Sequence, residues 1–236
     1  MPPPPGTPRQ KVVRHSPLRV RLRTPIAARV RLAPDALHRA LDRLTRLEGP
    51  LSTRVAIDGD LVALTTHDPE QGWFETVAVH GATPARHRRS AAVTVDLLLL
   101  REVVEYSRLA TSTGADAILT VRDGRAVGLS RWSVAASRVA PPIEVPPGPG
   151  GWTRIEEGVA VPAVEDREGT TTFTIPGASV TARNLVLERM HRRDLTAADI
   201  YETDGRVFLV ATDARDRGGA ISLIGAARIV YDSPPR

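Results

Sequence analysis

The sequence predicts an α+β fold in which two sheets carry a pair of helices on one face. Two observations predict it. An order of strand, helix and hairpin occurs twice between residues 29 and 140, and both helical segments show an amphipathic pattern. Each such helix must bury its apolar stripe against a sheet. The 236 residues, of which 42% are hydrophobic and 25% charged, have the composition of an ordinary globular protein.

The first repeat begins with a short strand through Val30 and Leu32, and Pro34-Asp35 then starts a helix. One side of that helix is apolar and comprises Leu37, Ala40, Leu41, Leu44 and Leu47. The opposite side carries Arg39, Arg43 and Arg46. Alternating residues on both sides of an Asp58-Gly59 turn then predict a hairpin that ends through Leu64.

The second repeat has the same order. Val93 and Val95 predict the strand, and Asp96 predicts the helix cap. We expect an inward side formed by Leu99, Val103, Tyr106 and Leu109, and an outward side formed by Arg101, Glu105 and Arg108. A hairpin follows around Asp123-Gly124. Two tandem units of this kind place their arginine rows side by side. The rows are either solvated helix faces or a surface that contacts phosphates.

Prolines and glycines divide the chain into five predicted segments. These are a flexible Pro/Arg-rich basic arm (1–28), the repeated block as one domain (29–140), an extended linker (141–151), a smaller second domain (152–231) and a tail (232–236). In the second domain we expect strands at Thr171–Ile175 and Val207–Thr212, an Asp204-Gly205 turn and a helix near Asn184–Asp194. That helix has Val186, Leu187 and Met190 on one side and Arg189, Arg192 and Arg193 on the other.

The net charge of +5 comes from the start of the chain, because eight bases precede the first acid, Asp35. The remainder has 24 bases against 27 acids. Such an arm is typical of a contact with nucleic acid or another polyanion, and a solvated tail is the alternative. The bases of the predicted contact are Arg9, Lys11, Arg14, Arg19, Arg21 and Arg23.

A series of short stretches is similar to a known family. They are Ala-Pro-Asp-Ala-Leu at a helix start, Leu64-Thr65-Thr66-His67-Asp68 before Pro-Glu-Gln-Gly-Trp, the strand Phe74–Val79, the stretch Ala91–Leu100, and Asp123-Gly124-Arg125. In this order they resemble one domain of the bacterial sliding clamp, the beta subunit of DNA polymerase III. Val210–Arg215 is similar to a signature of that family, Ala-Thr-Asp, in the second block.

The resemblance implies a clamp-like fold with two such units per domain, whose helices line a ring around duplex DNA. It implies a non-catalytic role as a processivity factor in DNA replication or as a DNA-tethered scaffold. Non-specific duplex DNA would be the partner, together with a DNA polymerase or other replication or repair proteins. The DNA-binding residues would be Arg39, Arg43, Arg46, Arg101, Arg108, Arg189, Arg192 and Arg193.

The chain also departs from this family. The bacterial subunit has three domains, whereas this sequence offers one full domain and a partial second. We therefore keep an alternative, a scaffold or regulator with a clamp-derived fold that binds proteins and does not encircle DNA. Exposed sheet edges favour pairing between chains, so we expect a homo-oligomer, with a dimer as the minimal form and a trimer as the form that closes a ring.

Catalytic patterns are weak. The chain has no cysteine, which excludes thiol catalysis and cysteine metal sites, and it has no phosphate-binding loop. His67-Asp68 leaves a metal-dependent hydrolase as a further alternative, but we expect this pair simply to end a strand. We predict no enzyme activity, no cofactor and no metal. No apolar stretch reaches the length of about 18 residues that a membrane span needs, so we expect no membrane contact and a cytoplasmic protein.

Overall fold

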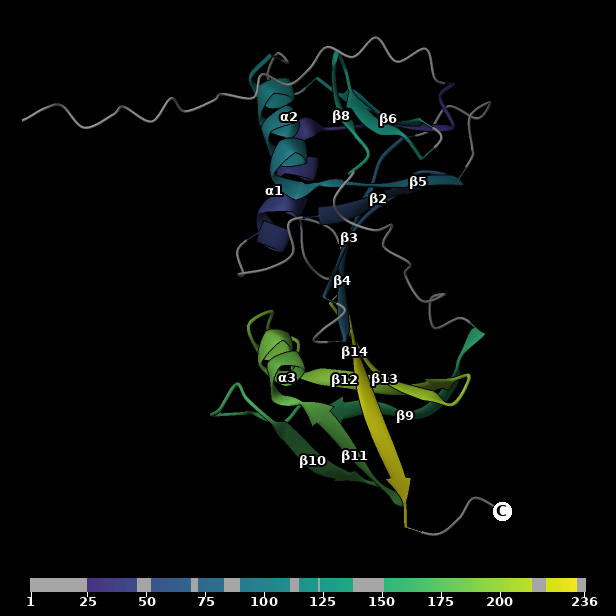
Figure 1. Cartoon of the computed structure of the whole chain (residues 1–236), viewed down its shortest axis with the longest axis vertical. Helices are drawn as coiled ribbons and strands as arrows, with labels where there is room; N and C mark the ends of the chain where they lie inside the picture. The colour runs from purple at the N-terminus through teal and green to yellow at the C-terminus, as the bar shows by residue number, and fades with distance from the viewer. Residues whose placement is uncertain are drawn as a thin grey trace, which may run out of the picture.

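The structure is a computed structural model that describes residues 25–45, 52–68, 72–82, 90–110, 115–122, 124–137, 151–213 and 220–232. These residues form two antiparallel sheets and three helices (Figure 1). The predicted α+β class is confirmed. Residues 1–24 of the predicted arm, most of the predicted linker and the tail beyond Asp232 lie outside the described residues. The predicted end of the arm at residue 28 is wrong, because Ala28 is buried in the first strand of the fold.

The smaller sheet has the strand order β1-β6-β7-β8. Its strands are β1 (Ala28–Leu32), β6 (Ala117–Arg122), β7 (Ala126–Leu129) and β8 (Trp132–Ala135). The first strand of the first repeat therefore pairs with the hairpin of the second repeat, which fixes the two repeats together.

The larger sheet has the order β5-β2-β3-β4-β14-β13-β12-β9. Its strands are β2 (Ser52–Asp58), β3 (Leu61–Asp68), β4 (Trp73–His80), β5 (Ser90–Asp96), β9 (Thr153–Ala160), β12 (Ala197–Thr203), β13 (Arg206–Asp213) and β14 (Ala220–Tyr231). β11 (Ala178–Arg183) pairs with the end of β14, and β10 (Thr170–Ile175) pairs with β11. The sheet continues from one predicted block to the other where β4 pairs with β14.

The described helices are α1 (Pro34–Thr45), α2 (Leu97–Ala110) and α3 (Asn184–His191). All three lie on the same side of the sheets, on the left in Figure 1. We call their solvent-exposed side the helix face. The expected pair, α1 and α2, packs side by side.

The second block contains a third copy of the repeated order. Strand, helix and three strands follow one another as β1-α1-β2-β3-β4, as β5-α2-β6-β7-β8 and as β11-α3-β12-β13-β14. The first strand of each unit also contacts the end of its own last strand, through Arg31 with Ala82, Val95 with Ala136, and Ala178–Ala182 with Ala227–Tyr231. The described chain thus consists of three related units. Two extra strands, β9 and β10, come before the third unit.

The predicted core of α1 is confirmed. Leu37, Ala40, Leu41 and Leu44 are buried, while Leu47 lies outside the described residues. The predicted turns at Asp58-Gly59 and Asp204-Gly205 are also present, while Asp123 of the third lies outside the described residues. Gly59 has φ +60° and fits the first position of a two-residue hairpin loop, and Asp204-Gly205 has φ values of +50° and +70°.

α2 differs from the expectation at three of its four inward residues, while Val103 is buried and Arg101 and Arg108 are exposed as expected. Its buried residues are Leu97, Leu100, Val103, Val104 and Ser107, whereas Leu99, Tyr106 and Leu109 are exposed. The run Leu97–Leu100 offers an apolar residue at every helical angle, so periodicity could not fix the rotation. Packing selects the set with i, i+3, i+4 and i+7 spacing, because α2 contacts α1 on one side and strands of both sheets below it.

The expected outward position of Arg189 on α3 is also wrong, since this residue is only 7% exposed. The side of α3 that bears Arg189 packs against Trp73 and Glu75 of β4, in the first block. A helix that contacts neighbours on two sides has little outward surface.

None of the helices among the described residues is both long and apolar enough to cross a membrane.

Candidate nucleic-acid interface

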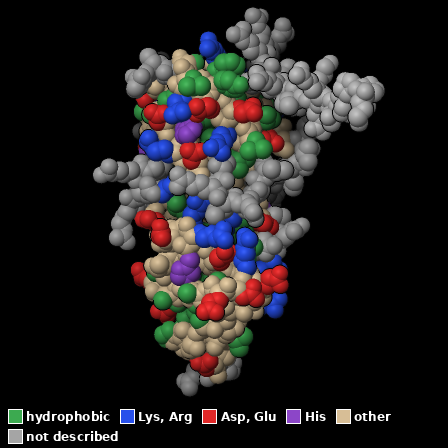
Figure 2. Space-filling model, turned by 90° about the vertical axis from the view of Figure 1, so that its left-hand side faces the viewer, with side chains coloured by type: hydrophobic (Ala, Val, Ile, Leu, Met, Phe, Trp, Pro, Cys, Tyr) green, Lys and Arg blue, Asp and Glu red, His purple; other side chains and the backbone are tan. Residues whose placement is uncertain are grey.

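Arginines and acids alternate on the helix face. Figure 2 shows blue and red side chains mixed over α1 and α2, with a histidine among them and apolar side chains above. The arginines expected here are Arg39 and Arg43 on α1, Arg101 and Arg108 on α2, and Arg192 after α3. Arg46 lies outside the described residues.

A charge network connects α1 to α2. The two nitrogens of His38 lie 3.3 Å from a carboxylate oxygen of Asp42 and 3.2 Å from one of Glu105. Arg101 donates to Asp42 at 2.9 Å, and Arg108 donates to Glu105 at 2.8 Å. The hydrogen bond between Arg108 and Glu105 lowers the pKa of the Glu105 carboxyl group, and the same hydrogen bond raises the pKa of Arg108. This network balances much of the positive charge that the sequence places on the helix face.

Arg39 differs from the other arginines of the helix face in its contacts. It is exposed, and it makes no hydrogen bond or ion pair with another described residue. It lies on α1 next to His38 of the charge network. Arg39 is therefore a cation that can meet an external anion without first releasing a described partner.

Arg189 and Arg193 are not on the helix face. Both contact Glu75, which is fully buried on β4, at 2.7 Å and 2.5 Å. Arg189 also lies over the Trp73 ring, 3.6 Å from its centroid, and Arg193 donates to the Arg43 carbonyl oxygen. Burial lowers the pKa of Arg189, while the Glu75 carboxylate opposes this shift. We call Glu75, Arg189 and Arg193 the junction triad, because it connects α3 to β4.

Sequence reasoning missed Glu75 and Trp73, although a signal exists. In β4 the inward positions are Trp73, Glu75, Val77 and Val79, at a spacing of two. A carboxylate in such a series is buried, and a buried carboxylate needs a cationic partner. The partner could not be identified, because it is supplied by a segment more than 100 residues later in the chain.

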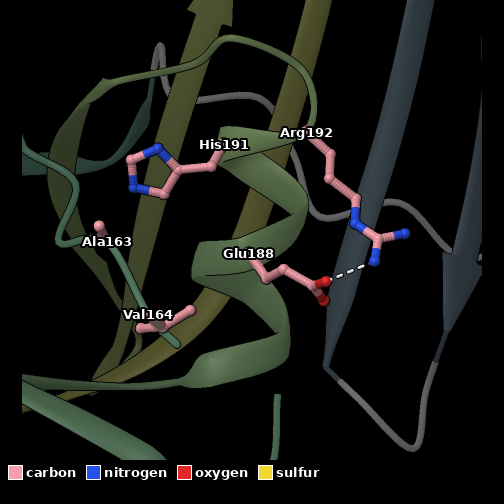
Figure 3. Close-up of a pocket in the computed structure, with 5 residues that line it drawn as sticks. All are labelled: Ala163, Val164, Glu188, His191 and Arg192. Carbon is pink, nitrogen blue, oxygen red and sulfur yellow. Dashed lines mark hydrogen bonds and ion pairs between the residues drawn. The ribbon is translucent and has the colours of Figure 1, made fainter. Parts of the chain in front are cut away.

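Arg192 belongs to a shallow pocket beside α3, with a volume of about 410 Å³. Figure 3 shows Arg192 turned toward Glu188, which accepts from it at 2.5 Å and from Arg167 at 2.8 Å. On the other side, His191 Nε2 donates to the carbonyl oxygens of Val161 and Pro162 at 3.1 Å and 3.0 Å. The polar side chains of this pocket thus already have partners, inside the pocket or next to it.

The solvent side of α2 also carries large apolar side chains beside its charged ones. Leu109 and Leu98 are 72% and 54% exposed, and Leu99 and Tyr106 are also exposed. The Tyr106 ring contacts the Trp132 ring of β8, with centroids 5.4 Å apart. We call Leu98, Leu99, Tyr106 and Leu109 the α2 apolar stripe. Large apolar side chains gathered on one exposed helix are typical of a contact surface.

His67 and Asp68 end β3, as expected. The His67 ring is stacked on the Phe74 ring, with centroids 4.0 Å apart and an interplanar angle of 2°. Burial lowers the pKa of His67, and the Asp68 carboxylate opposes the shift. In the described part of the chain, no three acidic or histidine side chains gather as a metal site would require.

The fold is that of the bacterial sliding clamps. Similar solved structures are the Pseudomonas aeruginosa DNA polymerase III subunit beta (13% identity, TM-score 0.50), the Helicobacter pylori beta clamp bound to a DNA ligase peptide (8%, 0.51) and the Caulobacter crescentus beta sliding clamp (12%, 0.51). Each comparison covers 88% of this chain and 66% of the other, so the chain spans about two thirds of the length of these structures.

No family model matches the sequence, and a search of curated proteins finds no match. The resemblance to the clamp family inferred from the sequence is confirmed at the level of fold. The DNA-binding role of the arginines on the helix face stays a prediction.

Proposed function

We propose that the protein is a non-catalytic, clamp-like protein that binds the backbone of duplex DNA without sequence specificity, as a processivity factor or a DNA-tethered scaffold. The observation that supports this most is the arrangement of the helices. All three lie on one side of the sheets (Figure 1), and Arg39, Arg101, Arg108 and Arg192, which lie on these helices or directly after them, are exposed. Guanidinium groups suit phosphates, and contacts to phosphate carry no base specificity.

The proposed contact uses Arg39 directly, and Arg101, Arg108 and Arg192 by exchange of partners. The last three are exposed and bound to acids at the surface. An exposed ion pair contributes about 0 to 1 kcal/mol, so a phosphate can replace the carboxylate at small cost. The junction triad is excluded from this proposal, because its two arginines are buried against Glu75.

The experiment compares two variants of equal charge. In the first, Arg39, Arg101, Arg108 and Arg192 are replaced by alanine. In the control, four exposed arginines from strands and turns, Arg31, Arg125, Arg154 and Arg206, are replaced by alanine. We expect the first variant to bind a random-sequence duplex about tenfold more weakly than the control at low salt. Equal affinities of the two variants would show that net charge, not the helix face, governs binding.

The basic arm would add to this contact. Deleting residues 1–24 removes its six predicted bases and ends before Ala27, whose N–H donates to the Val121 carbonyl oxygen at 2.9 Å. We expect weaker binding to duplex DNA and an unchanged melting temperature. A drop in melting temperature of many degrees would mean that the arm packs on the fold.

A protein-binding scaffold that does not encircle DNA is the second candidate. The α2 apolar stripe favours it, because phosphates gain nothing from leucine side chains. One similar structure was solved with a DNA ligase peptide, and we propose replication or repair proteins, including a DNA polymerase, as partners of this chain. This role would be supported if the parent captures such proteins and the double variant with Leu98→Glu and Leu109→Glu does not. DNA binding that persists in this variant would show that the two surfaces are separate.

We also propose that the chain forms a homo-oligomer, since its sheets have edge strands that pair on one side alone within the described residues.

A further inference from the structure

β10 is an edge strand whose backbone groups alternate between β11 and solvent. The Asn184 N–H donates to the Gly169 carbonyl oxygen at 3.1 Å, which makes residues 169 and 184 a hydrogen-bonded pair. In an antiparallel ladder such pairs recur at every second residue. With the register Thr170↔Arg183 to Ile175↔Ala178, residues 171, 173 and 175 therefore face β11. The N–H and C=O groups of Thr170, Thr172 and Thr174 point away from the sheet.

The other described sheet edges are protected. β9 carries Arg154, Glu156 and Glu157, and its pairing with β12 is interrupted by register shifts near Gly158. The remaining edges are short or are partly covered. β8 has four residues, β1 bonds to Ala82 in both directions, and the Thr94 carbonyl oxygen of β5 accepts from the Ser137 N–H.

Within the described part of the chain, β10 has none of these protections. Its six residues, Thr-Thr-Thr-Phe-Thr-Ile, include no charge, and its pairing with β11 has no register shift. Threonine, phenylalanine and isoleucine favour strands, and a regular uncharged edge is a template for a further strand. Figure 1 shows β10 at the lower outer margin of the sheet.

We infer that β10 joins two copies of the chain, by pairing antiparallel with β10 of the second copy about a twofold axis at Thr172. In this register Thr172 faces Thr172 of the second copy, and Thr170 faces Thr174 of the second copy. Each of the three outward residues then lies in a hydrogen-bonded pair. A register shifted along the strand would leave outward groups of Thr170 or Thr174 without a partner.

The side chains are compatible with this arrangement. Thr170, Thr172 and Thr174 are exposed and share one face of β10, so threonine would meet threonine across the new interface. No pair of like charges is brought together within the strand. The interface lies away from α1 and α2, as Figure 1 shows, so that the dimer leaves their exposed arginines accessible.

This inference specifies the surface of the proposed homo-oligomer and does not depend on DNA binding. If β10 is not the interface, the helix face can still bind duplex DNA. If DNA is not bound, the dimer is unaffected. Measuring oligomeric state and DNA affinity on the same variants therefore separates the two failures.

The absence of cysteine from the whole chain allows a direct test of the register. In Thr172→Cys the two thiols would lie across the twofold axis, where paired Cα atoms are about 5.5 Å apart, within the range of a disulfide. In the control Thr174→Cys, the two cysteines would be four residues apart along the strands, about 13 Å. We expect mild oxidation to convert the first variant to a covalent dimer and to leave the control mainly monomeric on a denaturing gel. Equal cross-linking of both variants, or of neither, would overturn the register.

A second test removes the interface. Thr172→Pro deletes an outward N–H and leaves the main-chain bonds to β11 in place, although it removes the exposed side-chain hydrogen bond of 2.8 Å between Thr172 Oγ1 and Thr181 Oγ1 of β11. We expect the dimer dissociation constant to rise about 30-fold, because two hydrogen bonds across the interface are lost, and the circular dichroism spectrum to be retained. Thr172→Lys, which brings two ammonium groups together, should act alike if the proline variant does not fold. The matched control is Ser133→Pro on β8. The inference would be overturned if only the β8 variant dissociates the dimer. It would also be overturned if the parent sediments as a monomer at micromolar concentrations.

Discussion

Glu75 on β4 and Arg189 on α3 are 114 residues apart in the sequence, and their charged groups lie 2.7 Å apart in a buried site. Arg193 contacts the same carboxylate, so one acid is shared by two cations there. Alongside them, the main chain of β4 pairs with β14. The junction between the first and third units is thus held by a continuous sheet on one side and by the junction triad on the other.

Glu75→Gln should destabilise the protein strongly, because it keeps the side-chain volume and removes the carboxylate that two buried guanidinium groups contact. We expect a loss of about 3 to 5 kcal/mol in the free energy of unfolding, measured by urea denaturation. Glu188→Gln is the control, since Glu188 also contacts two arginines but at the surface, and it should cost about 1 kcal/mol or less. A similar small loss in both variants would mean that the junction triad does not support the fold.

Gly225 on β14 allows α3 to approach the sheet. A Cβ atom at this position would overlap Val186 of α3. We expect Gly225→Ala to cost about 1 to 3 kcal/mol, and Gly151→Ala, where a Cβ meets no atom, to be nearly neutral. In the double variant with Val186→Ala the loss should be smaller than the sum of the single losses, as a double-mutant cycle would measure. Strict additivity would contradict the close packing.

The rotation of α2 can be tested on leucines alone. Leu100→Ala should cost about 2 to 5 kcal/mol, because Leu100 is fully buried. Leu98→Ala and Leu109→Ala should stay within about 0.5 kcal/mol, because these side chains are exposed. Thermal unfolding of the three variants checks the order. A larger loss for Leu109→Ala than for Leu100→Ala would restore the orientation expected from the sequence.

His67 gives the stability a dependence on pH with a definite sign. Its pKa is lowered in the folded protein by burial, while the unfolded chain has the ordinary value of about 6.5. As pH falls below about 6.5, the unfolded chain binds the proton more readily, and stability is lost. Urea denaturation at pH 7.5 and 5.5 should therefore show a smaller acid-induced loss for His67→Gln than for the parent. His80→Gln, whose side chain is 76% exposed, should behave like the parent, and an unchanged loss in His67→Gln would refute this role.

Local patterns were sufficient to predict the fold class, the order of the first two units and the apolar side of α1. A single apolar stripe with charged residues opposite, as in Leu37, Leu41 and Leu44, has one way to pack. The orientation of α2 was not predictable in this way, since Leu97–Leu100 fits several rotations and only the contacts with α1 and the sheets select one.

The candidate site was predicted less well, because charges that are distant in the sequence decide it. Arg101 and Arg108 were expected on the surface and are exposed, but their pairing with Asp42 and Glu105 depends on how α1 and α2 pack. Arg189 was assigned to the outward side, because nothing local indicates that β4 supplies a buried carboxylate to α3. Pairing between distant elements was the missing information in each case.

The most direct test of the DNA-binding proposal is the salt dependence of affinity for duplexes of unrelated sequence. Each phosphate contact contributes about 0.9 to the slope of log K against log salt concentration. We predict equal affinity for the different sequences and a steep slope in the parent. In the variant with Arg39, Arg101, Arg108 and Arg192 replaced by alanine, the slope should be smaller by about 2 to 4. A slope and an affinity that are unchanged in this variant would contradict the proposal that the helix face binds DNA.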